Sequence, residues 1–166
     1  SISIDNIRNV CFIGHGGSGK TTLAEAILHH CKATTRMGSV DDGTSISDYL
    51  AEEKDRQSSL NAAVLNCTYK GTLLHFLDAP GFPDFLGEAI SALSAADAAL
   101  ITITASEGIT ATTRKMFRRC KDLAMPTGII LTKMDAENIE LQALIDSVRE
   151  SFGDACLPLA LPLEAG

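Results

Sequence analysis

The sequence predicts an α/β fold: a doubly wound, mostly parallel sheet with helices on both faces and one antiparallel hairpin strand. Short apolar runs typical of buried strands alternate with segments of helical periodicity. A glycine-rich turn joins the first of these strands to the first helix. Gly14, Asp78, Ser106 and Thr132 each lie at or just after the end of an apolar strand. Ligands of such sheets bind beyond the carboxyl ends of the strands, so we expect these residues to surround one site.

The composition bounds the class of protein. With 166 residues, 45% of them hydrophobic and 21% charged, the chain can form one globular domain with a hydrophobic core. A net charge of −7 argues against a general nucleic-acid-binding surface. Five scattered cysteines without a C-x-x-C pair indicate neither a disulfide framework nor a zinc site, and they favour a cytoplasmic location. No apolar run approaches the ~20 residues of a membrane span, so we expect no membrane association.

The predicted elements alternate along the chain as this fold requires. After the first strand and helix, the connection 31–60 loses apolar periodicity, and connections of that length are usually functional or disordered. Strands at 63–69 and 72–77 form a hairpin around Lys70 and Gly71. The following segments are a helix at 85–93, a strand at 98–104, a helix at 109–123, a strand at 128–132, a helix at 137–152 and a tail, 153–166, without a periodic pattern.

The first strand-to-helix turn carries the strongest motif. Gly14, Gly19, Lys20 and Thr21 fill the four fixed positions of the phosphate-binding loop, G-x-x-x-x-G-K-[ST], which predicts the P-loop NTPase fold. The glycines let backbone N–H groups approach an anion, and the helix adds its positive N-terminal end. The lysine reaches the outer phosphates, and the threonine hydroxyl is placed to ligate Mg²⁺. Phosphate contacts are expected from Gly14, His15, Gly16, Gly17, Ser18, Gly19, Lys20, Thr21 and Thr22.

A second candidate segment follows the strand 72–77. Asp78 is placed to hold Mg²⁺ through water, and the N–H of Gly81 is placed to meet a γ-phosphate. A strand-ending aspartate followed by a Pro-Gly turn is also common without a ligand, so the phosphate-binding loop upstream gives this segment its weight. The phosphate-lining residues expected here are Asp78, Ala79, Pro80, Gly81 and Phe82.

A base-reading segment is predicted after the strand 128–132. The carboxylate of Asp135 can accept from the two donors that guanine offers and adenine lacks. Lys133 can lay its methylene stem along the base. The alternative is that Asp135 only caps the next helix. The guanine-binding residues expected here are Thr132, Lys133, Met134 and Asp135.

The connection 31–60 should supply a hydroxyl that completes the Mg²⁺ shell. Ser58 and Ser59 are the two candidates that its sequence offers. We expect the triphosphate to order this loop and its loss to release it, as in other nucleotide switches.

Taken together, these motifs resemble the GTP-binding domain of translational GTPases, and among them the elongation factor G group. Residues 78–85 (D-A-P-G-F-P-D-F) are similar to the family's D-T-P-G-H-x-D-F, and residues 53–59 to its E-x-x-R-G-I-T. The resemblance implies GTP or GDP as ligand, Mg²⁺ held by Thr21, Ser59 and Asp78, and the ribosome as partner. It also implies that 31–60 and 78–85 are the first and second switch segments of one GTP-binding domain, 1–166.

This sequence departs from the family pattern at several positions. Phe82 stands where the family has its water-positioning histidine, and Gly17 stands where it usually has an aspartate. Of the catalytic positions Lys20, Gly81 and Phe82, the last therefore cannot transfer a proton. His75, more typical of a core histidine, is the one to check for reaching the phosphates. Residues 1–166 also end before the family's last guanine-contacting loop.

Three functions are compatible with these residues. The first is a GTPase of the elongation factor G type that couples hydrolysis to a conformational switch. The second is a GTP/GDP-binding module with little hydrolysis, because of Phe82. The third is an ATP-using enzyme, against which Asp135 argues.

Overall fold

Five strands form one mixed sheet in the computed structural model, which describes residues 2–162. The strand order is β2-β3-β1-β4-β5; β1 pairs in parallel with β3 and β4, β4 pairs in parallel with β5, and β2 pairs antiparallel with β3. The predicted fold class is therefore confirmed, and positions 163–166 of the predicted tail lie outside the described residues. The strands are β1 (Ile7–Gly14), β2 (Ala63–Tyr69), β3 (Thr72–Asp78), β4 (Ala98–Thr104) and β5 (Thr127–Thr132).

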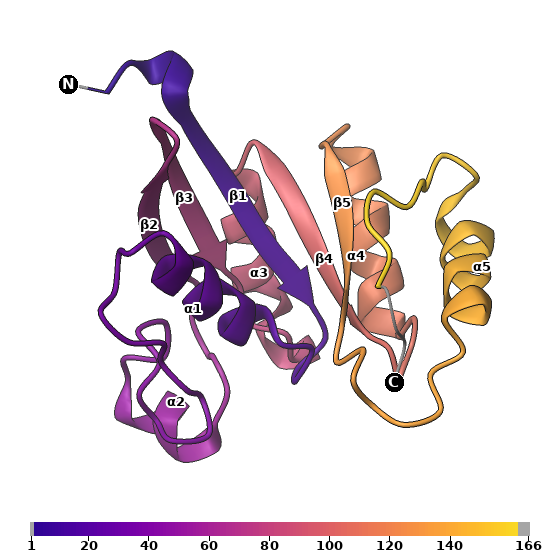
Figure 1. The fold of residues 1–166 in the computed structure, drawn as a ribbon, viewed down its shortest axis with the longest axis horizontal. Helices are drawn as coiled ribbons and strands as arrows, with labels where there is room; N and C mark the ends of the chain where they lie inside the picture. Colours follow the sequence, from indigo (N-terminus) through magenta and orange to yellow (C-terminus); the bar gives the residue numbers. More distant parts are fainter. Residues whose placement is uncertain (1, 163–166) are drawn as a thin grey trace.

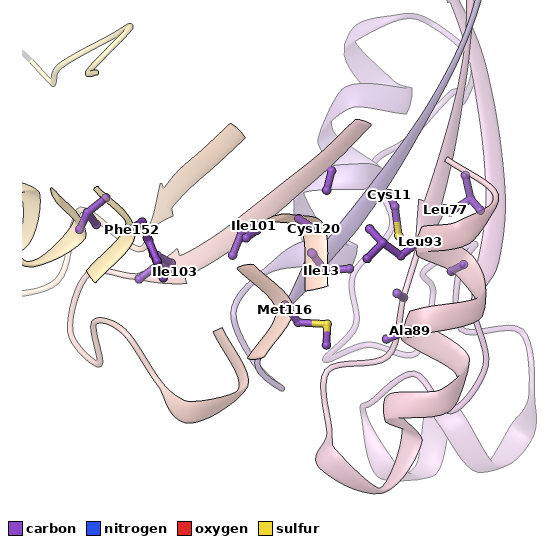
Figure 2. Packing of buried hydrophobic residues seen from close by; sticks show 14 residues of the cluster. Cys11, Ile13, Leu77, Ala89, Leu93, Ile101, Ile103, Met116, Cys120 and Phe152 are labelled. Atoms are coloured by element: carbon purple, nitrogen blue, oxygen red, sulfur yellow. The ribbon is translucent and has the colours of Figure 1, made fainter. Parts of the chain in front are cut away.

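Helices cover both faces of the sheet (Figure 1). On one face, α1 buries Phe12, Leu28 and Phe76. On the other face, α3, α4 and α5 enclose the larger core, which Figure 2 shows and which includes Leu93 and Met116. None of the helices within residues 2–162 combines the length and the apolar content that a bilayer crossing requires. The helices are α1 (Lys20–His30), α2 (Ala51–Arg56), α3 (Leu86–Ser94), α4 (Ala111–Asp122) and α5 (Leu141–Phe152), with short 3-10 turns η1 (Ile4–Asn6) and η2 (Pro83–Phe85).

Two predicted helix starts are corrected by the structure. The helix predicted at 137–152 begins only at Leu141, because Asn138 adopts a left-handed conformation (φ 60°) that a helix cannot contain. The helix predicted at 109–123 begins at Ala111, where the hydroxyl of Thr110 accepts from the N–H of Thr113 and ends the preceding loop.

The connection 31–60 is long, as predicted, but it is not devoid of regular structure. It contains α2, whose buried residue Glu53 accepts N–H groups from Leu50 at its start and from Leu60 and Asn61 beyond its end. A second buried carboxylate, Glu25 of α1, accepts the N–H groups of two further residues of the connection. Each of these two side chains accepts N–H groups from separate points along the connection, so together they tie its backbone to α1 and α2.

Candidate functional site

The sheet register brings the carboxyl ends of four strands together. Phe12 pairs with Asp78, Gly14 with Thr102, and Thr104 with Thr132. The carboxyl ends of β1, β3, β4 and β5 therefore lie together on one side of the sheet, as the sequence predicted for parallel strands. Ser106 lies two residues beyond the end of β4 and is exposed.

The phosphate-binding loop packs directly against the end of β4. A Cβ at Gly14 would lie 2.5 Å from Thr102 Oγ1, so only glycine fits there. The hydroxyl groups of Ser18 and Thr102 share a hydrogen bond of 2.7 Å. Gly19 caps α1 in a left-handed conformation (φ 83°), and Gly17 is likewise left-handed (φ 76°) and exposed. These contacts hold the loop at the N-terminus of α1, where the helix dipole favours an anion.

Lys20 is buried beneath this loop with only 6% of its surface exposed. Its Nζ donates to the carbonyl oxygens of His15 (2.9 Å) and Gly14 (3.4 Å). Burial lowers the pKa of the lysine, and the nearby Asp78 carboxylate opposes that shift. A Cβ on Gly81 would lie 2.5 Å from Lys20 Nζ, so the two residues predicted to act at the γ-phosphate lie side by side.

A chain of hydroxyl and carboxyl groups lies beside Lys20. Thr21 Oγ1 donates to Asp78 Oδ2 (2.7 Å) and lies 3.5 Å from Ser59 Oγ, which donates to Asp48 Oδ1 (2.7 Å). The structure thus brings together the three predicted metal-binding residues, Thr21, Ser59 and Asp78, from three separate segments. Their role as metal ligands stays a prediction. Of the two candidate serines, Ser59 is the one at this position, whereas Ser58 uses its N–H to bond the Glu53 carbonyl.

Asp78 is fully buried, and its Oδ1 makes no hydrogen bond within the part of the chain that the structure describes. Burial raises the pKa of its carboxyl group to about 6; the hydrogen bond from Thr21 and the charge of Lys20 act in the opposite direction. A buried carboxylate oxygen without a protein partner, beside two hydroxyl groups, fits Mg²⁺, which prefers oxygen ligands. Residues 2–162 contain no cluster of three or more His, Cys, Asp or Glu side chains suited to a metal, so phosphate oxygens and water would have to complete the shell.

Phe82 is 47% exposed, and its ring lies over the phosphate-binding loop. A Cβ added to Gly16 would be 2.9 Å from the ring, so the two residues are in contact. His75 does not take over its place: it lies within β3 opposite Asn66, three residues before the strand ends at Asp78. The histidine nearest to the loop is His15, within the loop itself.

The predicted base-reading segment begins at the end of β5. The Thr132 hydroxyl donates to the carbonyl oxygen of Ser18 (2.9 Å), so this residue ties the segment to the phosphate-binding loop. Lys133 takes a left-handed conformation (φ 54°), and both it and Asp135 are exposed. The alternative that Asp135 caps the next helix is wrong, because α5 begins at Leu141 with Glu140 as its N-cap. A role of Asp135 in guanine binding stays a prediction.

Sequence reasoning missed several polar residues around the site. Asp48 lies in a connection without a periodic pattern, and only its contact with Ser59 shows its place. Thr102 and Thr104 were interpreted only as residues of the strand 98–104. Their hydroxyl groups are buried and contact the phosphate-binding loop. A hydroxyl in an otherwise apolar buried strand was the one available signal, because a buried hydroxyl needs a partner.

Comparisons with known proteins identify the family. The profile of the elongation factor Tu GTP binding domain matches residues 5–160. An elongation factor G-like protein of Mycobacterium tuberculosis is 38% identical over 94% of this chain and 22% of its own length. The mitochondrial ribosome-releasing factor 2 of Schizosaccharomyces pombe is 34% identical over 98% of this chain and 20% of its own length.

The tetracycline resistance protein TetM of Enterococcus faecalis is 34% identical over 88% of this chain and 23% of its own length. A crystal structure of a Thermus thermophilus protein superposes with a TM-score of 0.91 at 39% identity, covering 96% of this chain and 24% of that one. The chain thus spans between a fifth and a quarter of these relatives. With the sheet order, the phosphate-binding loop and this profile in agreement, the chain belongs to the elongation factor Tu GTP-binding domain family.

Proposed function

We propose that this chain is the GTP-binding domain of a cytoplasmic, ribosome-associated translation factor of the elongation factor G type, in which GTP hydrolysis drives a conformational switch. The observation that carries the proposal is the meeting of Lys20, Thr21, Ser59 and Asp78 at one end of the sheet. The family match and relatives such as ribosome-releasing factor 2 support the ribosomal context. The domain spans 1–166, with 31–60 and 78–85 as its two switch segments.

The proposal gives each group a role in binding. Lys20 and the N–H groups of the phosphate-binding loop hold the phosphates, and Gly81 donates its N–H to the γ-phosphate. Thr21 and Ser59 would hold Mg²⁺ directly and Asp78 would hold it through water; Mg²⁺ supplies charge neutralisation at the β- and γ-phosphate oxygens. The segment from Thr132 through Lys133 and Met134 to Asp135 reads guanine.

A titration with two nucleotides tests this assignment. GDP and ADP, each with Mg²⁺, are titrated calorimetrically into the 166-residue chain and into an Asp135→Ala variant. We expect binding of GDP only, and a loss of at least about tenfold in GDP affinity for the variant, because a paired carboxylate is removed. Glu137→Ala, which removes another exposed carboxylate nearby, is the matched control. A preference for ADP would instead support the ATP-using enzyme, and no binding of GDP would contradict the proposal.

A second function, a GTP/GDP-binding module with little hydrolysis, is favoured by one specific observation. The ring of Phe82 covers Gly16, at the position where the family's histidine orients the attacking water. A phenyl ring can neither accept a proton nor hold a water molecule by hydrogen bonds, so attack on the γ-phosphoryl group loses this assistance.

Single-turnover GTP hydrolysis, with and without ribosomes, separates the two functions. Without ribosomes, we expect slow hydrolysis by the unaltered chain, faster hydrolysis by Phe82→His, and no gain in Phe82→Leu, which removes the ring without adding a titratable group. Brisk ribosome-stimulated hydrolysis by the unaltered chain would exclude the binding-only function.

A further inference from the structure

Both ring nitrogens of His15, in the phosphate-binding loop, make polar contacts. Only 8% of the residue is exposed. Its Nδ1 lies 2.6 Å from the carbonyl oxygen of Gly16, and its Nε2 lies 3.1 Å from Thr104 Oγ1 and 3.3 Å from Glu107 Oε2. The ring therefore joins the loop to the end of β4 and to the segment that follows.

The contact with the Gly16 carbonyl oxygen shows which ring nitrogen of His15 carries a hydrogen. A carbonyl oxygen can only accept, so Nδ1 carries a hydrogen and donates it. In the neutral ring, Nε2 then accepts from the hydroxyl of Thr104; in the protonated ring, it donates to that oxygen or to Glu107. The bond from Nδ1 to Gly16 is present in both states, so it is a permanent part of the loop.

This bond fixes the orientation of the next N–H group. The peptide between Gly16 and Gly17 is trans and planar, so its N–H points opposite to its carbonyl group. Because the carbonyl faces the His15 ring, the N–H of Gly17 faces the other way. Gly17 is exposed, and nothing lies within 4 Å of a Cβ placed on it, so there is room beside this residue for a ligand.

Within residues 2–162, the ring of His15 makes the only hydrogen bond to the Gly16 carbonyl, and the Gly17 N–H has no hydrogen-bond partner. Gly16 and Gly17 lack side chains, and a glycine pair can rotate its shared peptide at little cost. A rotated peptide would present the Gly16 carbonyl oxygen to an anion and would repel it. Thr104 is fully buried at the end of β4 and so provides a rigid anchor for the ring.

We propose that His15 is a positioning residue of the phosphate-binding loop, which holds the Gly16 carbonyl so that the Gly17 N–H is directed at the phosphates of the bound nucleotide. This inference rests on the proposed function, because it assumes that a guanine nucleotide occupies the loop. The histidine acts through the backbone and does not itself touch the nucleotide.

A pair of amide variants tests the proposal. In His15→Asn, the side-chain amide nitrogen stands as many bonds from the backbone as Nδ1, so it can still donate to Gly16. In His15→Gln, the amide nitrogen instead stands where Nε2 was and can reach Thr104 only. We expect the affinity for GDP, measured by calorimetry, to fall by about three- to tenfold in His15→Gln and to stay within about twofold in His15→Asn.

The same changes at the exposed His29 of α1 are the controls, and neither should alter GDP affinity. In nuclear magnetic resonance spectra, GDP should shift the Gly17 amide proton in the unaltered chain and in His15→Asn, and shift it less in His15→Gln. The amide of Lys133 should respond to GDP in all three, which reports that base binding persists.

The outcomes separate this inference from the proposed function. A role limited to anchoring the loop on Thr104 would reverse the order, with His15→Gln the milder change, and would overturn the inference. Equal affinities of both variants and the unaltered chain would overturn it as well, while leaving the proposed function intact. If the unaltered chain does not bind GDP, both fail.

Discussion

At the scale of single residues, several buried charged side chains lie close together at the carboxyl ends of the strands. Lys20, Asp48 and Asp78 are each at least 94% buried, and the charge of Asp48 acts on the pKa values of both Lys20 and Asp78. Burying charged groups costs folding free energy unless partners compensate for the lost hydration. Since Asp78 Oδ1 has no hydrogen bond within residues 2–162, this compensation is incomplete for Asp78.

Replacing Asp78 by asparagine should therefore stabilise the chain in the absence of nucleotide. The pKa of this carboxyl is about 6 in the folded chain against 3.8 for an unperturbed aspartate, so the folded state holds the proton more tightly than the unfolded state. Stability then falls as the pH rises from about 4 to 6, and ionisation costs up to about 3 kcal/mol above that range. Asp78→Asn avoids this cost at pH 7.

Thermal unfolding of the nucleotide-free chain at several pH values measures this effect. The variant should melt higher than the unaltered chain at pH 7, with a gain that shrinks as the pH falls below 6. The exposed Asp84→Asn is the control and should change little. A gain independent of pH would contradict the ionisation argument.

Gly81 permits a contact that no other residue could make. A Cβ at this position would lie 2.5 Å from the carbonyl carbon of His15 and 2.6 Å from the nitrogen of Gly16. Gly81→Ala must push the second switch segment away from the phosphate-binding loop and its N–H away from the γ-phosphate, so we expect the affinity for a non-hydrolysable GTP analogue to fall by about tenfold or more. The control is Gly87→Ala in α3, where a Cβ meets nothing within 4 Å. It should leave the nucleotide affinity measured by calorimetry unchanged, which would show that an alanine in this region is not harmful by itself.

At the scale of elements, the connection 31–60 is held by side chains from helices and not by a ladder of its own. The carboxylate of Glu25 on α1 and that of Glu53 on α2 accept backbone N–H groups of this connection. The same connection delivers Ser59 and Asp48 to the site. The two carboxylates are therefore the contacts by which helices position this connection.

Glu25→Gln should loosen this connection. An amide offers one acceptor oxygen where the carboxylate offers two, so the N–H of either the buried Gly38 or the exposed Ile46 loses its partner. We expect faster hydrogen exchange of these two amides and a stability loss of about 1–3 kcal/mol. Glu52→Gln, an exposed residue that pairs with Arg56, should do neither. Unchanged exchange at both amides would show that Glu25 does not hold the loop.

At the scale of the whole molecule, the sheet separates two cores of unequal size. The smaller lies under α1, and the larger joins α3, α4 and α5 on the opposite face. Phe152 of α5 stacks on Phe117 of α4 with their ring centroids 4.2 Å apart. This contact joins the C-terminal helix to the rest of the larger core.

Phe152→Ala should therefore lower the free energy of unfolding by about 3–5 kcal/mol, the usual cost of removing a buried phenyl ring. Urea denaturation followed by circular dichroism measures the change. Leu123→Ala, which truncates a residue that is 39% exposed, should cost far less. Similar losses in the two variants would mean that α5 is not docked through Phe152.

The strands and the phosphate-binding loop could be predicted because their signals are local. β2 and β4 have the predicted limits, since buried strands read as short apolar or alternating runs. The turn at Lys70 and Gly71 also formed as predicted, with both residues at positive φ. By contrast, α2 escaped prediction because only Glu53 of its six residues is buried, so it carries no apolar stripe.

The sequence by itself determined the fold class, the position of the phosphate-binding loop and the polar residues at the strand ends, because each depends on neighbours within a few positions of the chain. Only the tertiary structure decided that Ser59, which the family resemblance had favoured over Ser58, lies beside Thr21, that Asp48 joins them, and that Thr104 anchors His15. These contacts span between 11 and 89 positions. They depend on how α1, the connection 31–60 and β4 pack together, which no local pattern of residues encodes.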